Sequence, residues 1–78
     1  MNLDAIKNVY FIGIGGIGMS ALALYFMDNK KNVSGYDRTP SDITKSLEEA
    51  GVKIHYEDDI DLIPQDVITG KSDSLIIY

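Results

Sequence analysis

The order of apolar and polar positions divides the chain into short apolar runs and segments with helical spacing. The run from Val9 to Ile14 is almost continuously β-branched, aromatic or aliphatic, which is typical of a strand buried on both faces of a parallel sheet. The segment from Ile17 to Asp28 instead carries apolar residues at positions i, i+3, i+4 and i+7, which are Met19, Leu22, Ala23 and Phe26. We therefore predict a strand at 9–14 and a helix at 17–28 with these four residues on its buried face.

The middle of the chain predicts a second strand and a second helix. A short run at 33–36 predicts the strand. Thr39 and Pro40 then indicate a helix start, with Thr39 as the N-cap and Pro40 as the first helical residue. Gly51 is placed to end this helix in a left-handed conformation. The buried stripe of the helix is predicted to be Ile43, Leu47 and Ala50.

The last third of the chain alternates in the same way. Strands are predicted at 52–56 and 74–78, with a polar turn at 69–73. Between the strands, a short helix can cover a sheet face, and Pro64 must stand at its end or at a break; its apolar residues are Ile60, Leu62, Ile63 and Val67. The order β-α-β-α-β-α-β with right-handed crossovers predicts an α/β, Rossmann-like parallel sheet with helices on both faces. We predict strand order 3-2-1-4, with a ligand at the carboxyl ends beside the first strand.

Length and charge limit the functions open to such a fold. With 78 residues, the chain can form one small domain, 1–78. The net charge of −5 argues against non-specific binding to nucleic acid, which needs a basic surface. Cysteine is absent, so disulfides and thiolate metal sites are excluded, and a cytoplasmic location is compatible with the composition. We expect no membrane span and no signal peptide, because no apolar run is long enough and the start, MNLDAIKN, lacks the signal pattern.

The turn between the first strand and the first helix carries the candidate chemistry. Gly13, Gly15 and Gly18 form the pattern G-x-G-x-x-G, with Gly16 inside it. In this context the first glycine allows the tight turn, the second lets the backbone approach a diphosphate, and the third lets the helix pack tightly on the strand. The N–H groups of the first helical turn would point at the anion. We favour this interpretation over a glycine-rich turn that only permits packing, because the motif follows a predicted strand and opens a predicted helix.

Three further features are weaker. Asp37 ends the second predicted strand, where it can accept hydrogen bonds from a ribose or base; the alternative is that it only starts a turn. An acidic cluster at 57–61 is more typical of a solvated turn before a helix than of a metal site. His55, the only histidine, has no nucleophile at a catalytic spacing, so we expect a structural or solvent-facing role.

Longer segments around the glycines point to a family. FIGIGGIGMSALA at 11–23, VSGYD at 33–37 and LEEAGVKIH at 47–55 closely resemble the N-terminal domain of the UDP-N-acetylmuramate–L-alanine ligases, a Mur ligase family of bacterial peptidoglycan synthesis. The resemblance runs from about residue 8 to the end of the chain. It implies that this domain holds the UDP part of UDP-N-acetylmuramic acid. A central domain of the family binds ATP and magnesium, and a third binds the L-alanine that attacks the activated carboxyl group.

The resemblance also implies roles for single residues. Gly13, Gly15, Gly16, Ile17 and Gly18 would form the loop on the diphosphate. Asp37, with Arg38, would face the uridine. Two departures stand out: the family often has a glycine or asparagine followed by histidine near the nucleotide, where this chain has Glu57 and Asp58, and the family's ATP loop of the type G-x-x-G-K-T-T is absent. We therefore expect a fragment with no catalytic residue, ATP site or metal of its own.

Other interpretations stay open on the residues alone. The glycine motif and Asp37 fit a NAD-binding domain of an oxidoreductase or a regulatory sensor equally well. A structural module that binds nothing is a third option. Because the apolar strand at 74–78 would pair with a further strand in the family, we also expect weak self-association through it.

Overall fold

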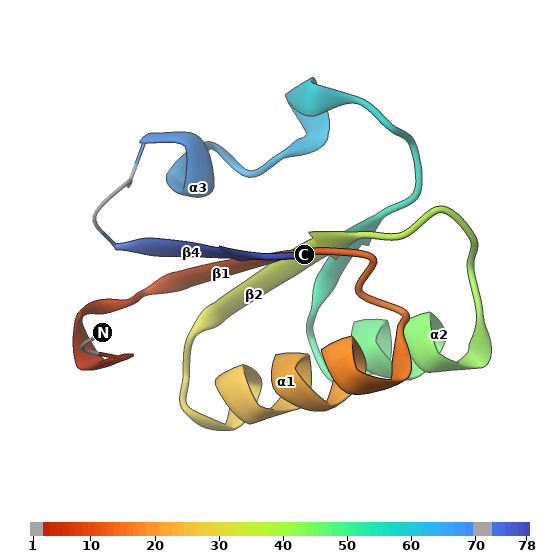
Figure 1. Ribbon diagram of the computed structural model, residues 1–78, viewed down its shortest axis with the longest axis horizontal. Helices are drawn as coiled ribbons and strands as arrows, with labels where there is room; N and C mark the ends of the chain where they lie inside the picture. The colour runs from red at the N-terminus through yellow and green to blue at the C-terminus, as the bar shows by residue number, and fades with distance from the viewer. Residues whose placement is uncertain (1–2, 70–72) are drawn as a thin grey trace.

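Four parallel strands form the centre of the protein, in a computed structural model that describes residues 3–69 and 73–78 (Figure 1). They are β1 (Asn8–Ile12), β2 (Asn32–Tyr36), β3 (Lys53–His55) and β4 (Ser74–Ile77), in the order β3-β2-β1-β4. In the shared register, Val9 lies opposite Val33 on one side and Leu75 on the other. The predicted α/β, Rossmann-like fold and its strand order are confirmed.

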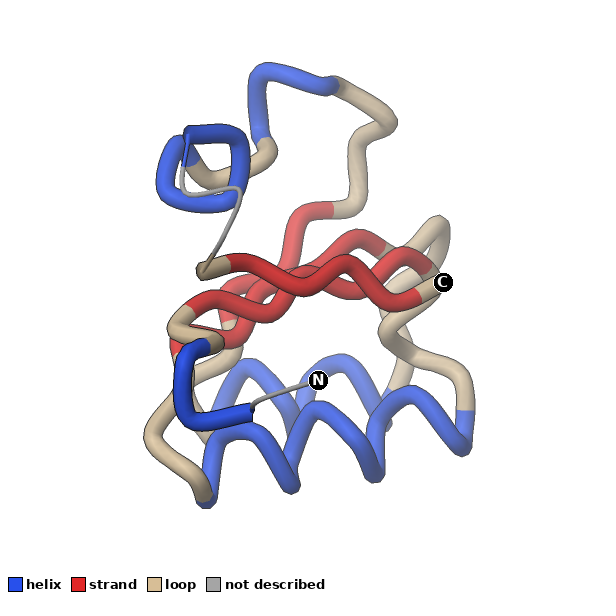
Figure 2. The backbone as a smooth tube through the Cα atoms, turned by 60° about the vertical axis from the view of Figure 1, so that its left-hand side comes forward, coloured by secondary structure: helices blue, strands red, loops and turns tan. Residues whose placement is uncertain are grey.

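Helical segments cover both faces of this sheet, as predicted. The two longer helices, α1 (Ile17–Asp28) and α2 (Asp42–Glu49), lie side by side on one face (Figures 1 and 2). The 3-10 turn η2 (Ile60–Leu62) and the short helix α3 (Gln65–Thr69) lie on the other face, and a 3-10 turn η1 (Leu3–Ala5) precedes β1. Pro64 separates η2 from α3, so the predicted break is confirmed. Most of the predicted turn at 69–73 lies outside the described residues. None of the described helices has the length and apolar character needed to span a membrane.

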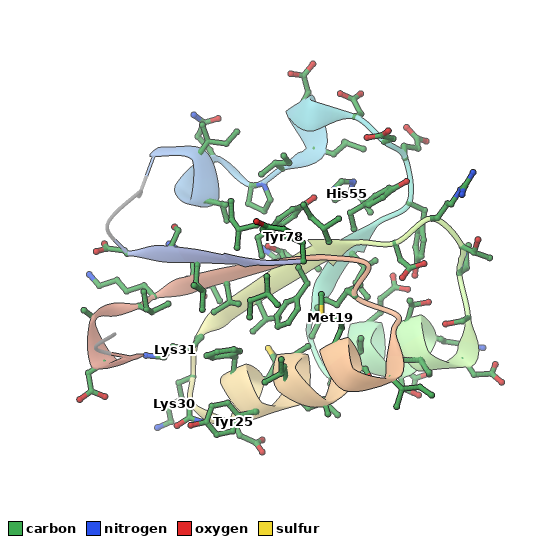
Figure 3. The ribbon with its side chains drawn as sticks, in the orientation of Figure 1. Met19, Tyr25, Lys30, Lys31, His55 and Tyr78 are labelled. Carbon is green, nitrogen blue, oxygen red and sulfur yellow. The ribbon has the colours of Figure 1, made fainter. Side chains whose placement is uncertain are left out.

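The core lies between the sheet and the pair α1 and α2. Val9 and Phe11 of β1 are fully buried and face Ala23 and Phe26 of α1. The predicted stripe of α1 is wrong at Leu22, which is 43% exposed. Because α1 has no charged side chain before Asp28, its apolar pattern does not single out one face. Figure 3 shows the outcome: Met19 points into the space between α1 and the sheet, and Tyr25 points away from it.

The first strand ends two residues earlier than predicted. Gly13 has a φ of +81°, a left-handed conformation that ends the strand. Ile14, predicted as the last strand residue, is fully buried but lies in the turn after it. Its side chain therefore anchors the turn to the core.

The start and the stripe of α2 also differ from the prediction. Ser41, not Thr39, is the N-cap: the Ser41 hydroxyl accepts a hydrogen bond from the Thr44 N–H, and the Thr44 hydroxyl oxygen accepts one from the Ser41 N–H. Thr39 lies in the turn before the helix, where its N–H donates to Asp37 Oδ1. Ala50, predicted to be buried, is the exposed C-cap, and Thr44 is buried instead. The predicted left-handed end at Gly51 is confirmed by its φ of +105°.

Candidate functional site

The loop between β1 and α1 is held against the end of β2 by its own backbone. The N–H groups of Gly13 and Ile14 both donate to the Tyr36 carbonyl oxygen, at 2.8 and 3.1 Å. The Gly16 N–H donates to the Gly13 carbonyl oxygen at 3.1 Å. The tight turn predicted for the first glycine is confirmed, because its φ of +81° is strained for any other residue.

Asp37, one residue beyond β2, joins this loop to the rest of the carboxyl edge. Its Oδ2 accepts a hydrogen bond from the Gly15 N–H at 2.8 Å, and its Oδ1 accepts one from the Thr39 N–H at 3.0 Å. The Asp37 N–H in turn donates to the His55 carbonyl oxygen of β3 at 3.2 Å. The residue lies beside the glycine loop as its position in the sequence predicted, and both of its carboxylate oxygens contact the protein's own backbone.

The glycines of the motif have different reasons to be glycine. A Cβ atom on Gly15 would lie 2.8 Å from Asp37 Oδ2 and 3.0 Å from Thr44 Cγ2, so no side chain fits there. A Cβ on Gly18 would meet nothing within 4 Å, and the tight helix–strand packing predicted for this glycine is therefore wrong. A close approach is instead found at Gly35 of β2, where a Cβ would lie 2.7 Å from Cδ1 of Ile14 in the turn before α1. Its place inside an apolar strand was the sequence signal for such a close approach.

The first turn of α1 is open. Its N-cap is Gly16, which has no side chain to cap the helix, and the first turn contains no acidic residue. Within the part of the chain that the structure describes, no acceptor is found for the N–H groups of Ile17, Gly18 and Met19. These three donors stand at the positive end of the helix dipole. Such an arrangement can bind an anion at the carboxyl edge of the sheet.

Comparison with known proteins places this chain in a family. The sequence profile described as "Mur ligase family, catalytic domain" matches residues 8–75. The chain belongs to the Mur ligase family. Among curated proteins it is 70% identical over 66 residues to the UDP-N-acetylmuramate–L-alanine ligase of Flavobacterium psychrophilum, covering 85% of this chain and 15% of that protein.

Two further relatives of this Mur ligase chain match along all of its length. They are the UDP-N-acetylmuramate–L-alanine ligases of Flavobacterium johnsoniae, 58% identical, and of Cytophaga hutchinsonii, 54% identical. In each case the match covers 100% of this chain but only 17% or 16% of the relative. The chain therefore corresponds to about a sixth of the proteins that it resembles.

The structure brings six of the seven predicted site residues of this Mur ligase chain together around the open turn. The six are the five loop residues Gly13, Gly15, Gly16, Ile17 and Gly18, together with Asp37. Arg38 is exposed in the segment that follows. Sequence reasoning missed Met19, whose N–H belongs to the open turn although its side chain packs on the core. The signal that could have found it is that the first N–H groups of any helix, including that of the third helical residue, have no acceptor within the helix.

His55 has a structural role, as predicted. Its Nδ1 lies 3.0 Å from the Glu57 carbonyl oxygen, which can only accept, so Nδ1 carries the proton and Nε2 accepts from the Tyr10 hydroxyl at 2.6 Å. Figure 3 shows His55 on the α3 side of the sheet, away from α1. Burial raises the pKa of Tyr10, with smaller contributions from Tyr36 and Asp58. Tyr10, His55 and the Glu57 carbonyl oxygen thus form a hydrogen-bonded cluster on the sheet face opposite α1 and α2.

The acidic segment after β3 forms an exposed turn. Glu57, Asp58 and Asp59 are all exposed, and the Asp59 carboxylate accepts a hydrogen bond from the Asp61 N–H at 2.9 Å. This bond starts η2, which agrees with the solvated turn that the sequence favoured. In the described ranges 3–69 and 73–78, no three histidine or acidic side chains are grouped so that they could hold a metal ion.

Proposed function

We propose that this chain binds the UDP part of UDP-N-acetylmuramic acid, as the N-terminal nucleotide-binding domain of a peptidoglycan-synthesis ligase. Family membership and the names of relatives up to 70% identical support the substrate class. The single observation that carries the proposal is the open first turn of α1, with three N–H donors at the positive end of a helix dipole. A cytoplasmic location is part of the same proposal, because the substrate class is a cytoplasmic nucleotide sugar.

In this proposal some residues of the loop bind the diphosphate and others fix the shape of the loop. The diphosphate oxygens accept hydrogen bonds from the N–H groups of Ile17, Gly18 and Met19. Gly13, Gly15 and Gly16 give the loop its shape, because their own N–H groups are used inside the protein. Asp37 and Arg38 lie toward the uridine, where Arg38 can supply a donor and each Asp37 oxygen keeps a second lone pair.

The ligation step is assigned to the rest of the longer protein. ATP and magnesium need a phosphate loop with lysine and hydroxyl side chains, and this sequence has no such loop. The exposed acidic turn does not fit a metal either, since its carboxylates are not grouped for one. We therefore propose that ATP-dependent addition of L-alanine requires residues beyond these 78, and that the chain alone shows neither ATP hydrolysis nor alanine ligation.

An NMR titration of the 78-residue chain tests the binding proposal. We expect UDP to shift the amide signals of Ile17, Gly18 and Met19 with a dissociation constant of about 0.1–1 mM, equivalent to roughly 4–5.5 kcal/mol. NAD should shift them only at higher concentration. If NAD shifts these signals at lower concentration than UDP, the chain is a dinucleotide-binding domain and the proposal is wrong.

A matched variant separates binding from folding. In Gly18→Ala, the new methyl group enters space that is empty in the structure, so the fold should be kept and the helix should be unchanged or up to about 1 kcal/mol more stable. The same methyl group lies where the diphosphate would approach the first turn. UDP affinity should therefore fall at least fivefold without loss of stability. Unchanged UDP affinity would place the nucleotide elsewhere.

The edge strand β4 supports a second, weaker proposal. Among the described strands β4 has a neighbour only on the β1 side, and Ile76 is 50% exposed. An apolar strand at the edge of a sheet favours strand-to-strand association. We propose weak self-association through 74–78, which light scattering at rising concentration would detect as an increase in mean mass. A strict monomer at millimolar concentration would contradict it.

A further inference from the structure

We propose that Asp37 is a positioning residue: its carboxylate clamps the glycine loop in the shape that leaves the first turn of α1 open. The two oxygens hold two different segments, the β1–α1 loop through the Gly15 N–H at 2.8 Å and the segment before α2 through the Thr39 N–H at 3.0 Å. The backbone of Asp37 is fixed as well, because its N–H donates to the His55 carbonyl oxygen. One residue thus connects the ends of β2 and β3, through its backbone, to the segments before α1 and α2, through its side chain.

The position of Gly15 leaves room for the Asp37 carboxylate only because glycine has no side chain. A Cβ atom on Gly15 would stand 2.8 Å from the clamping oxygen, so glycine at this position and a carboxylate at Asp37 fit only as a pair. Glycine is also the residue with the most backbone freedom to lose. Without the clamp, the segment from Gly15 to Gly16 depends on the two bonds of Gly16, whose N–H donates to the Gly13 carbonyl oxygen and whose carbonyl oxygen accepts from the Ser20 N–H.

The clamp changes what the second glycine of the motif does. Its N–H already points at an anion, the Asp37 carboxylate, so a diphosphate cannot use that donor while the clamp holds. The donors that remain are those of Ile17, Gly18 and Met19. A loop that is ordered before the ligand arrives binds it with a smaller entropic cost. Asp37 therefore strengthens anion binding without touching the anion.

Binding of two probes, inorganic diphosphate and UDP, tests this inference. This binding test rests on the proposed function. Inorganic diphosphate has no ribose, whereas UDP has one. In Asp37→Ala we expect the affinity for diphosphate to fall about five- to tenfold and the affinity for UDP to fall by at least the same factor, because UDP also loses the proposed uridine contact. Asp37→Asn should be intermediate, because its amide oxygen can accept only one of the two N–H bonds with unchanged geometry.

Asp42→Ala is the matched control. Asp42 is exposed in the first turn of α2 at the same edge, so its removal changes the net charge by the same amount without touching the loop. We expect its affinities for both probes to stay within twofold of the parent chain. If Asp37→Ala weakens UDP and leaves diphosphate unchanged, Asp37 is a ribose contact and the clamp is wrong. The clamp is also wrong if neither affinity falls relative to Asp42→Ala.

Amide hydrogen exchange tests the clamp without any ligand. In the parent chain the Gly15 and Thr39 amides should exchange at least tenfold more slowly than the Gly18 amide, which has no acceptor. Asp37→Ala should remove this protection and Asp37→Asn should restore part of it. Unchanged protection of Gly15 in Asp37→Ala would overturn the clamp, whatever the chain binds. A chain that binds neither probe but shows the predicted exchange would contradict the proposed function and support the clamp.

Discussion

The two long helices start at the same edge of the sheet, but their first turns are built in opposite ways. At α2 the cap residue is Ser41, the third residue is Thr44, and the two side chains satisfy each other's backbone N–H groups. An acid, Asp42, adds a favourable charge at the positive end of the dipole. At α1 the corresponding positions are Gly16 and Met19, which offer no oxygen, and no acid stands in the first turn.

The proposed function explains this difference as stability given up for binding. An open surface hollow lies beside the start of α2, lined by residues such as Ser41, Thr44 and Tyr56, but the capping box there already uses the N–H of Thr44. Among the described residues, the start of α1 keeps three N–H donors without a protein acceptor. Such donors are stabilising only when water or a ligand accepts from them. Under the proposed function, the open first turn of α1 binds the ligand and the capped first turn of α2 serves stability.

The largest expected effect comes from Gly15, which contacts both helix starts. Gly15→Val would push a branched side chain against the Asp37 carboxylate and the Thr44 methyl group. Overpacking of this kind typically costs about 1–3 kcal/mol, and the lost clamp adds to it. We expect the free energy of unfolding, measured by urea denaturation, to fall by about 2 kcal/mol or more. UDP binding should be lost as well. Gly18→Val, the same change in open space, is the control and should stay within about 0.5 kcal/mol of the parent chain.

Closing the open end is the next test. Gly16 has φ −65° and ψ 149°, an extended conformation that any residue can adopt at an N-cap. Gly16→Asp would place a carboxylate where the diphosphate is proposed to bind, and the helix dipole favours it by about 0.3–1 kcal/mol. The chain should become slightly more stable and bind UDP at least tenfold more weakly, which is about 1.4 kcal/mol. Gly16→Ser, without the charge, should have a smaller effect on binding; equal binding in all three chains would contradict the role of the open turn.

Removing the cap of α2 should lower the stability of the fold without changing UDP affinity. Ser41→Ala removes the hydroxyl that accepts from the Thr44 N–H, at a typical cost of about 1 kcal/mol. The free energy of unfolding should fall by that amount, and UDP affinity should remain within twofold. A large loss of UDP affinity with an intact fold would mean that the α2 end takes part in binding, and the distinction between the two helix starts would fail.

The sequence was sufficient wherever a local pattern decides the structure. The bounds of α1, the left-handed Gly51 and the break at Pro64 depend on residues a few positions apart, and all three are confirmed. The strand order follows from the right-handed crossover rule and the position of the glycine motif. The glycine loop was likewise recognisable as the candidate site.

The failures arise where residues of the same type are locally equivalent. Thr39 and Ser41 are both of capping type, and the helix begins after Ser41, whose hydroxyl accepts from the Thr44 N–H. The prediction gave a tight packing role to Gly18 and none to Gly35, because only the folded structure shows that the side chain of Ile14 packs on Gly35. Periodicity also could not orient α1, a helix that is apolar almost all round. Each error lies where tertiary packing chooses between locally equivalent residues.

The smallest expected effect concerns Tyr56, which is hydrogen-bonded to the capped helix α2. The Tyr56 hydroxyl donates to Glu48 Oε1 of α2 at 2.5 Å, and the pKa of Tyr56 is raised mainly by desolvation and then by this hydrogen bond. A raised pKa means that the folded state favours the neutral phenol, so its contribution is complete below the unfolded pKa of about 10 and is lost as the pH rises through the folded value. Because Tyr56 is only partly buried, solvent screens this interaction, and the contribution should be no more than about 0.5 kcal/mol.

Urea midpoints at pH 8 and pH 11 measure this contribution. The matched control is Tyr25→Phe, because Tyr25 is 50% exposed on α1. The raised pKa of Tyr10 is common to both variants, so it cancels in the comparison. The fall in stability between the two pH values should be smaller in Tyr56→Phe than in Tyr25→Phe, since only the first variant lacks the phenol that must ionise beside Glu48. UDP affinity at pH 8 should be the same in both, because neither hydroxyl reaches the open turn of α1. An equal fall in the two variants would show that Tyr56 adds nothing to the capped end, and the stability of that end would then rest on the Ser41–Thr44 pair.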